Sequence, residues 1–190
     1  MDFRELAIET RSVRRFLQEE RPEREELLGF IDSARLAPCG ANLQLIRFSA
    51  VSDAETCSRI FPALNWAGYL SDWEGPEEGE RPSGYIVIHI PRDRRRHIPV
   101  DAGIAAAYIV LAARESGFGS CMIMSFEPEV VLESLKTPEG YEPFLVIALG
   151  VPGEEVVLEE AEGSIRYYRD GSGVHRSEEH TSELQSPLCI

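Results

Sequence analysis

Three arginines crowd near the N-terminus, in the stretch TRSVRRF over residues 10–16. Arg11 and Arg14 are three residues apart, and Ser12 lies between them. Two guanidinium groups and a hydroxyl at this spacing could converge on one dianion, because the forked donors of arginine match phosphate oxygens. The alternative, which these residue types alone favour, is ordinary surface ion pairing with Glu9, Glu19 and Glu20.

A second polar segment, PCGANLQ over residues 38–44, follows a predicted helix. Gly40 and its small neighbours would let the backbone approach a flat ligand closely. The amides of Asn42 and Gln44 offer a donor and an acceptor together, as needed to read the edge of a heteroaromatic ring. The alternative is an ordinary polar loop.

The chain has 190 residues, a formal net charge of −14 and a pI near 4.7, with 43% hydrophobic residues. This composition is typical of one globular domain. The acidic balance argues against nucleic acid as a partner, because binding phosphates generally requires a basic face. An anionic ligand must therefore be bound locally. The charge run PRDRRRH over residues 91–97 is interpreted as a solvated loop rather than a site for the phosphate of a nucleotide cofactor or for nucleic acid.

The four cysteines and four histidines lack the spacing of metal ligands, so no metal site is predicted. Cys121 lies in an apolar strand and is interpreted as an inert core thiol. The N-terminal MDFRELAIE is too polar for a signal peptide, and no apolar run reaches membrane-spanning length. These features favour a cytoplasmic protein with no membrane partner.

Helices and strands alternate along the chain, which predicts a sheet covered by helices on both faces. The helix over residues 99–117 is apolar nearly all round, so we expect it to be buried on every side, with a subunit interface covering part of it. The loop over residues 62–84 holds Trp66 and Trp73, which either serve function or pack the loop onto the body. The expected helices span 2–9, 22–37, 53–61, 99–117 and 127–136, and the expected strands 47–53, 85–90, 119–124 and 144–150, with an edge strand at 164–170.

The end of the chain has an unusual composition. Residues 176–186, RSEEHTSELQS, read residue for residue as the translation of a common DNA-sequencing adapter. We therefore interpret residues 176–190 as a disordered, non-native tail and residues 1–175 as the folded domain. The alternative is a natural disordered tail.

Taken together, these segments resemble the FMN-dependent nitroreductase family over nearly all of residues 8–175. The resemblance implies an α+β fold, namely a three-layer α/β/α sandwich with a central mixed sheet flanked by helices. It also implies a homodimer in which the long helix is buried at the interface. The motifs that carry it are TRSVRRF, ARLAPCGANLQ, DAGIAAAYIVLAARESGFGSC, MIMSF and PFLVIALGVPGEE, and LNWAGYLSDWEGPEEGERPSGYIVI is similar to a compact bacterial and archaeal branch.

The same resemblance implies a set of FMN-binding residues. The arginine and serine run would grip the phosphate and the polar edge of the flavin, and the 38–44 loop would reach the flavin from the partner subunit. The strand end after the long helix would lie beside the ring, with the backbone of Met124 near N5. Thr10 stands where the family often has a further Arg, and Cys39 replaces the usual Ser. The residues assigned in this way are Arg11, Ser12, Arg14, Pro38, Cys39, Gly40, Asn42, Gln44, Asn65, Asp101, Met122, Met124 and Ser125.

The activity implied is that of an FMN-dependent NAD(P)H oxidoreductase. NADH or NADPH would reduce FMN at N5, and a nitroaromatic, quinone or similar electron-poor small molecule would then accept the electrons, in ping-pong turnover without a required side-chain acid or base. Three alternatives stay open: the same fold with dehalogenation, ene-type reduction or flavin fragmentation; a flavin-binding protein without turnover; and an anion-binding module without flavin.

Overall fold

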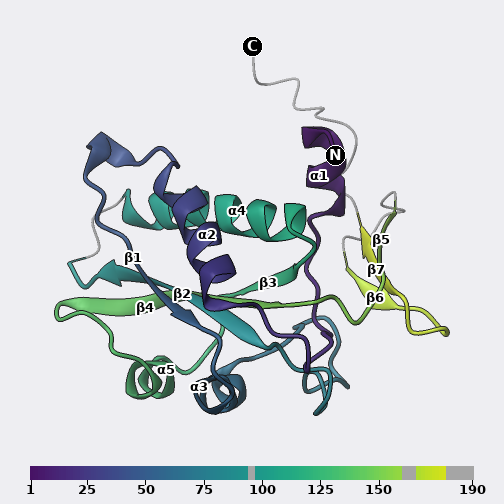
Figure 1. The fold of residues 1–190 in the computed structure, drawn as a ribbon. Coiled ribbons are helices and arrows are strands. Elements are labelled where there is room, and N and C mark those ends of the chain that lie inside the picture. The colour runs from purple at the N-terminus through teal and green to yellow at the C-terminus, as the bar shows by residue number, and fades with distance from the viewer. Residues whose placement is uncertain (94–96, 160–165, 179–190) are drawn as a thin grey trace.

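The computed structural model describes residues 1–93, 97–159 and 166–178. Within them lie a four-stranded sheet with strand order β1-β2-β4-β3 and a small three-stranded sheet with order β5-β7-β6 (Figure 1). The helices are α1 (Phe3–Glu9), α2 (Arg24–Arg35), α3 (Ala54–Ile60), α4 (Ile98–Glu115) and α5 (Pro128–Ser134). The strands are β1 (Arg47–Val51), β2 (Gly84–Pro91), β3 (Gly119–Ile123), β4 (Tyr141–Gly150), β5 (Val156–Glu159), β6 (Tyr168–Arg169) and β7 (His175–Glu178).

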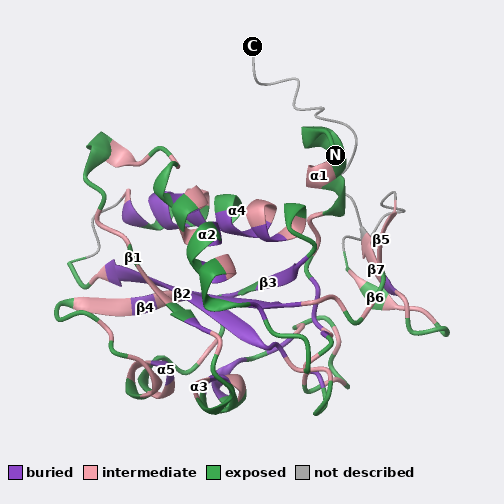
Figure 2. Cartoon of the chain, viewed as in Figure 1, coloured by how far each residue is buried: buried purple, intermediate pink, exposed green. Residues whose placement is uncertain are grey.

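The α+β class and the three layers are confirmed, with α2 and α4 on one face of the larger sheet and α3 and α5 on the other (Figure 1). Alternate residues of the central strands enter two separate cores. Ile86 and Ile88 of β2 pack with α2 and α4, whereas Tyr85 and Val87 pack with α3 and α5. Figure 2 shows the resulting buried sheet between the helical layers. Burial on both faces explains the nearly continuous apolar run of β2.

The expectation of a mixed central sheet is wrong in detail. All three pairings of the larger sheet are antiparallel, and its parallel contact is an isolated bridge between Ser12 and Ser120 at the outer edge of β3. Alternating helices and strands predict the layers. They do not predict strand direction, because a helical connection can return the chain in either sense.

Local caps set the helix ends. Asp53 accepts a hydrogen bond from the Thr56 N–H at 2.8 Å and so begins α3, as its position predicts. The helix expected from Pro22 begins instead at Arg24, because Glu23 and Glu26 form a capping box. Gly117, with φ of +86°, ends α4 in the left-handed conformation expected of a C-cap.

Helix α4 is not buried on every side within one chain. One face packs on the sheet, and the other leaves Val100 and Tyr108 exposed, at 61% and 39%. Gly103 and Ala107, at helical spacing between them, are also exposed. The helix therefore presents an uncovered apolar face, defined here as the α4 face of Val100, Gly103, Ile104, Ala107, Tyr108 and Leu111.

The C-terminal segment departs most from expectation. The edge strand predicted over residues 164–170 is the two-residue β6, and residues 164 and 165 lie outside the described residues. Strands β5 and β7, which were not predicted, pair in parallel, and β6 pairs with β7 antiparallel. Arg176–Glu178, expected to begin a disordered tail, belong to β7 because their backbones pair with β5. Residues 179–190 lie outside the described residues, as do Arg94, Arg95 and Arg96 of the charge run.

The two tryptophans serve packing. Trp66 is 8% exposed and contacts Phe61, with ring centroids 5.9 Å apart. Arg169 stacks over the Trp73 ring at 4.2 Å. The packing interpretation of this loop is thus confirmed. Within the described ranges, no helix has the length and apolar character needed to cross a membrane.

Candidate functional site

The predicted arginine cluster lies along the outer edge of β3. The Val13 N–H donates to the Ser120 carbonyl at 2.9 Å, which fixes Ser12 beside the start of this edge strand. A small cavity of about 50 Å³ opens there, lined by Thr10, Arg11, Ser12, Val110, Ser120 and Met122. The sequence-predicted Arg11, Ser12 and Met122 therefore come together.

The same edge continues as an apolar surface. Met122 and Met124 are 51% and 65% exposed. Just beyond them the Asn65 N–H donates to the Ser125 carbonyl at 3.0 Å, and the Asn65 amide donates to the Ser125 hydroxyl at 3.1 Å. We call the stretch from Arg11 and Ser12 through Met122 and Met124 to Ser125 and Asn65 the edge half-site. Exposed apolar side chains between polar groups suit a flat heteroaromatic ligand.

The two predicted phosphate-binding arginines have different partners. The Arg11 guanidinium donates to the carbonyls of Ala7 and Thr10, at 3.0 and 2.8 Å, at the end of α1. The Arg14 guanidinium lies 3.1 Å from Nε2 of His175 and 4.4 Å from the centre of the Tyr167 ring. Their convergence on a common point is therefore not present in this arrangement of side chains.

The surface ion pairs expected as the alternative, between these arginines and Glu9, Glu19 and Glu20, are replaced by ion pairs with other residues. Arg15 pairs with Glu80 at 3.1 Å, and Glu9 pairs with Arg114 at 2.7 Å. Glu80 lies far from Arg15 in sequence, so the pairing depends on how the 62–84 loop folds back. Exposed pairs of this kind contribute little to stability, so they do not explain the clustering of the arginines.

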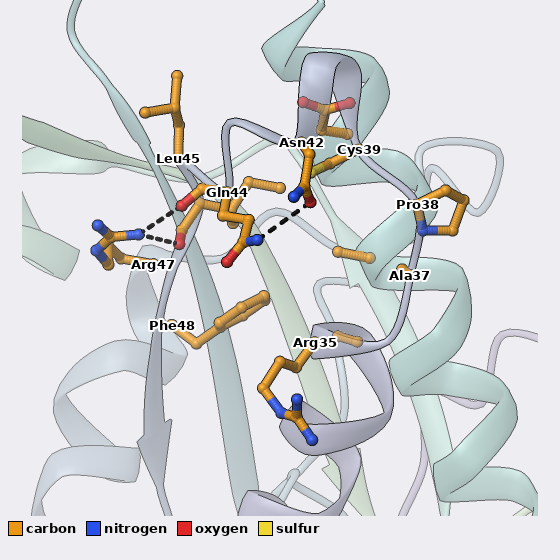
Figure 3. Close-up of a pocket in the computed structure, with 13 residues that line it drawn as sticks. Arg35, Ala37, Pro38, Cys39, Asn42, Gln44, Leu45, Arg47 and Phe48 are labelled. Carbon is orange, nitrogen blue, oxygen red and sulfur yellow. Dashed lines mark hydrogen bonds between the residues drawn. The ribbon is translucent and has the colours of Figure 1, made fainter.

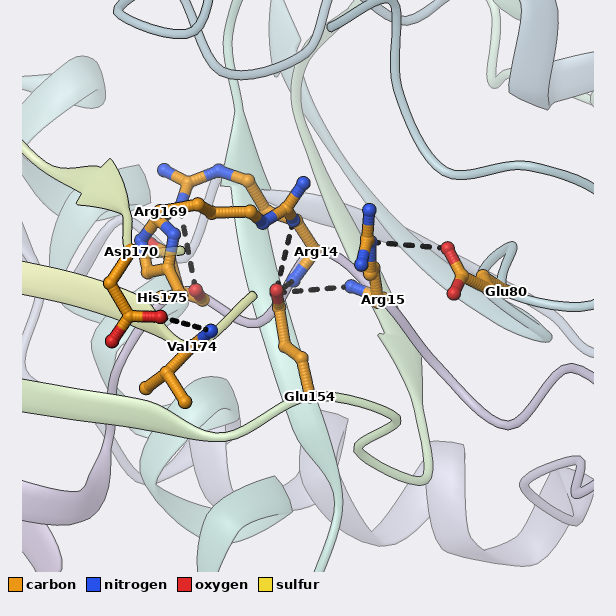
Figure 4. Close-up of polar contacts among 9 residues, drawn as sticks. Arg14, Arg15, Glu80, Glu154, Arg169, Asp170, Val174 and His175 are labelled. Atoms are coloured by element: carbon orange, nitrogen blue, oxygen red, sulfur yellow. Dashed lines mark hydrogen bonds and ion pairs between the residues drawn. The ribbon is translucent and has the colours of Figure 1, made fainter. Parts of the chain in front are cut away.

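Glu154 organises the backbone of the cluster, which the sequence did not predict. Its Oε1 accepts hydrogen bonds from the N–H groups of Arg14 and Arg15, at 2.5 and 3.1 Å, and its Oε2 accepts one from Arg169 at 2.9 Å (Figure 4). The carboxylate is 3% exposed. A buried carboxylate is stable only when it is hydrogen-bonded and paired, as here. No local motif around Glu154 signals this role.

The 38–44 loop forms a separate pocket of about 250 Å³ (Figure 3). Ala41, Asn42 and Gln44 have φ values of 49°, 55° and 51°, so three non-glycine residues occupy the left-handed region. Backbone in this region is strained and is typical of binding sites. We call this pocket the loop half-site; its sequence-predicted lining residues are Pro38, Cys39, Asn42, Gln44 and Asp101.

Two residues of α4 and the turn before it shape this loop. The Asp101 carboxylate, 6% exposed, accepts a hydrogen bond from the Gly40 N–H at 2.8 Å. A Cβ at Gly40 would lie 2.8 Å from Cδ2 of His97, so only glycine fits against that ring. The Gln44 amide donates to the Asn42 side-chain oxygen at 3.1 Å. His97 was not singled out in the sequence.

The two half-sites share no lining residue. Asp101 and Ala105 of α4 border the loop half-site, and Val110 borders the cavity of the edge half-site. With a rise of about 1.5 Å per residue, Ala105 and Val110 are about 7.5 Å apart along the axis. The chain therefore groups the predicted residues into two places rather than one.

Burial governs the titratable groups near the edge half-site. It lowers the pKa of His175 to about 4, and the positive charge of Arg14 acts in the same direction. Burial also raises the pKa of the Cys121 thiol, which agrees with an inert core cysteine. In the part of the chain that is described, no cluster of three or more His, Cys, Asp or Glu residues could hold a metal ion.

Sequence comparisons identify related proteins. YodC of Bacillus subtilis, which carries the name NAD(P)H nitroreductase, is 26% identical over 157 residues, covering 67% of this chain and 78% of its own. An iodotyrosine deiodinase of Thermotoga neapolitana is 26% identical over 167 residues, covering 79% of this chain and 88% of its own.

Structural comparison agrees. An FMN-dependent nitroreductase from Clostridium difficile R20291 superposes with a TM-score of 0.60 at 29% identity, covering 76% of this chain and 84% of its own. The model of the nitroreductase family matches residues 7–74 and 79–151, well over half of the chain. This chain therefore belongs to the nitroreductase family.

Proposed function

We propose that this chain is an FMN-dependent oxidoreductase that uses NADH or NADPH to reduce electron-poor small molecules such as nitroaromatics or quinones. The observation that carries the proposal is the edge half-site, where exposed methionines lie between an arginine–serine cavity and a pair of polar side chains. Membership of the nitroreductase family supports it, as does the likeness to an FMN-dependent nitroreductase.

The residues of the edge half-site fit the chemistry of FMN. Arg11 and the Ser12 hydroxyl are charged and neutral donors for a phosphate. Met122 and Met124 provide an apolar, polarisable surface for the isoalloxazine ring. Asn65 and Ser125 carry the amide and hydroxyl that could bind its polar edge. When bound, FMN would accept a hydride at N5 and pass the electrons on to the acceptor.

The chain's own contribution is therefore binding and orientation. The edge strand is rigid because β3 pairs with β4 along its whole length. Ser12 is fixed beside that strand through the Val13–Ser120 hydrogen bond, and Asn65 is held to Ser125, two residues beyond the end of the strand. Groups on or tied to a paired strand keep their geometry better than groups on a free loop, which favours precise placement of a flat ligand.

We further propose a homodimer in which the α4 faces of two copies pack together. The face exposes apolar residues along several turns, which is unusual for a surface helix of a monomer. Packing of α4 against its copy would bring the loop half-site of the partner subunit to the edge half-site of this one. That arrangement would explain why one chain holds the predicted residues in two places.

The test is the visible spectrum of the protein reconstituted with FMN, recorded before and after anaerobic NADH or NADPH. We expect bound flavin whose bands bleach, followed by reoxidation on adding a nitroaromatic. Flavin bands that persist with both reductants would instead support a flavin-binding protein without turnover. A protein that retains no FMN would contradict the proposal and favour an anion-binding module.

A second candidate is reductive dehalogenation on the same cofactor. The iodotyrosine deiodinase relative favours it, since it matches 79% of this chain, compared with 67% for YodC. Iodide release from an iodinated phenol by the reduced protein would support this activity. Turnover of a nitroaromatic without iodide release would exclude it.

A further inference from the structure

Arg14 is a buried cation with no acidic side-chain partner among the described residues. It is 8% exposed, and none of the ion pairs among the described residues includes its guanidinium. The carboxylate of Glu154 bonds to the backbone N–H of Arg14 and to the side chain of Arg169, but not to the Arg14 guanidinium. Burying a charge without a counter-ion is costly, so such a group points to an anion supplied by a ligand.

The contacts of this guanidinium hold it without neutralising it. The Tyr167 ring lies against its face, with Cζ 4.4 Å from the ring centre. Nε2 of His175 lies 3.1 Å from Nη1. The imidazole is neutral near pH 7, because burial lowers the pKa of His175 to about 4, and it can therefore accept this hydrogen bond. An aromatic face and a neutral acceptor both leave the positive charge intact.

The Arg14 guanidinium lies next to a residue of the edge half-site. Its Nη1 lies 3.5 Å from the carbonyl oxygen of Ser12, the residue that borders the arginine–serine cavity. Tyr167 is itself fixed, because its ring lies 5.0 Å from that of Tyr69 and its hydroxyl accepts a 3.4 Å hydrogen bond from the Tyr69 N–H. His175 is fixed by its place in β7, where it is 1% exposed.

We propose that Tyr167 and His175 are positioning residues, which hold the Arg14 guanidinium in place for the anionic flavin while leaving its charge unneutralised. The inference rests on the proposed function. It gives the small C-terminal sheet a role in cofactor affinity, although that sheet lies outside the residues matched by the family model. Figure 4 shows His175 reaching Arg14 from this sheet.

The experiment is a double-mutant cycle on FMN affinity in the full chain, measured by quenching of flavin fluorescence. Tyr167→Leu removes the aromatic face, and Tyr167→Phe keeps it. We expect Tyr167→Leu to weaken FMN binding about tenfold, the effect of a partly buried cation–π contact, and Tyr167→Phe to stay near wild type. In an Arg14→Ala background the same Tyr167→Leu change should alter FMN affinity less than about twofold, because its effect passes through Arg14.

A matched control is Tyr168→Leu, which alters the neighbouring residue whose hydroxyl donates to Glu159 at 3.1 Å. Equal losses of affinity from Tyr167→Leu in both backgrounds would overturn the inference, as would no loss in the wild-type background. If Tyr167→Leu does not fold, His175→Leu can replace it. Its loss of FMN affinity should likewise be large in the wild-type background and small in the Arg14→Ala background. A wild-type chain that binds no FMN would refute the proposed function as well, which distinguishes that failure from a failure of the positioning role alone.

Discussion

The backbone N–H of Gly40 donates a 2.8 Å hydrogen bond to the carboxylate of Asp101, which lies in the first turn of α4. This bond ties the strained 38–44 loop to the longest helix of the chain. It also gives a buried acidic side chain its partner. The loop conformation thus depends on a residue far from it in sequence.

Replacing Asp101 should loosen this loop. We expect Asp101→Ala to lower the free energy of unfolding by about 2 kcal/mol, because it removes a charged hydrogen bond and leaves the half-buried N–H of Gly40 without its acceptor. Asp101→Asn keeps an acceptor oxygen and should cost less. Urea denaturation of the three proteins measures the difference. If both variants lose the same stability, the Gly40 contact is not what Asp101 contributes.

Gly40 is expected to tolerate no side chain while His97 is present. A Cβ there would approach Cδ2 of His97 to 2.8 Å, so Gly40→Ala should lower the free energy of unfolding by about 1–2 kcal/mol through overpacking. Adding His97→Ala should relieve part of that loss.

The control for this prediction is Gly29→Ala in α2, where no atom lies within 4 Å of the added Cβ. Alanine favours a helix over glycine by about 1 kcal/mol, so this variant should be at least as stable as wild type. A Gly40→Ala protein as stable as Gly29→Ala would show that the His97 ring moves aside freely.

Arg14 should matter more for cofactor affinity than for folding. We expect Arg14→Ala to weaken FMN binding by about 1.5–3 kcal/mol, the range of a charged hydrogen bond. A fluorescence titration with FMN measures this, with Arg59→Ala in α3 as a control arginine that pairs only weakly with Glu55, at 4.0 Å. If Arg14→Ala binds FMN as tightly as the control variant does, Arg14 does not contribute to FMN binding.

The α4 face should control the oligomeric state. We expect Tyr108→Glu to shift a dimer toward monomer, because a buried unpaired carboxylate at an interface is costly. Size-exclusion chromatography with light scattering measures the mass. Glu115→Gln, at the end of α4, is a control outside the α4 face. A Tyr108→Glu protein with unchanged mass would place the interface elsewhere.

Acid should destabilise the fold through His89. This side chain is fully buried, and Nε2 lies 2.8 Å from the Ser49 hydroxyl. Burial lowers the pKa of His89 from its ordinary 6.5 to about 4. Between these values the unfolded chain binds more protons than the folded one, so the stability contributed by the neutral side chain is complete above pH 6.5 and is lost as the pH falls toward 4.

The expected loss from this histidine is at most about 3 kcal/mol over that range. Urea denaturation at pH 7.5 and 4.5 measures it in the wild type and in His89→Gln. The variant should lose less stability between the two pH values, although His175, whose pKa is also lowered to about 4, keeps part of the dependence. An unchanged dependence in His89→Gln would mean that the protonation of His89 does not cause the loss of stability in acid.

The fold could largely be predicted from local patterns. Strand β2 is a nearly continuous apolar run, and α4 is apolar over most of its length. The burial of both elements could therefore be predicted from their residue types. The Asp53 cap and the Gly117 stop are local signals as well. The small C-terminal sheet was missed because its strands are short and lack a strong apolar pattern; their pairing is decided by the Glu154, Arg169 and Asp170 contacts that hold them.

The sequence indicated the candidate residues of the site, but it did not predict that Arg11 and Arg14 lie apart. Their spacing predicted that Arg11 and Arg14 bind one anion together. In the structure Arg11 contacts the end of α1, whereas Arg14 contacts Tyr167 and His175. The long arginine side chain can place its guanidinium in many directions, and the spacing of two arginines in the sequence does not determine which direction each takes. Tertiary neighbours make that choice.

The sequence by itself determined the helices and the strands of the larger sheet, because periodicity and caps act over a few residues. It also indicated the polar side chains that we propose bind an anionic flavin. Only the tertiary structure decided that Asp101 and His97 shape the 38–44 loop and that Glu154 holds the arginine cluster. The same holds for the apolar face that α4 leaves uncovered. These contacts join residues distant in sequence, and their geometry depends on how the layers pack together.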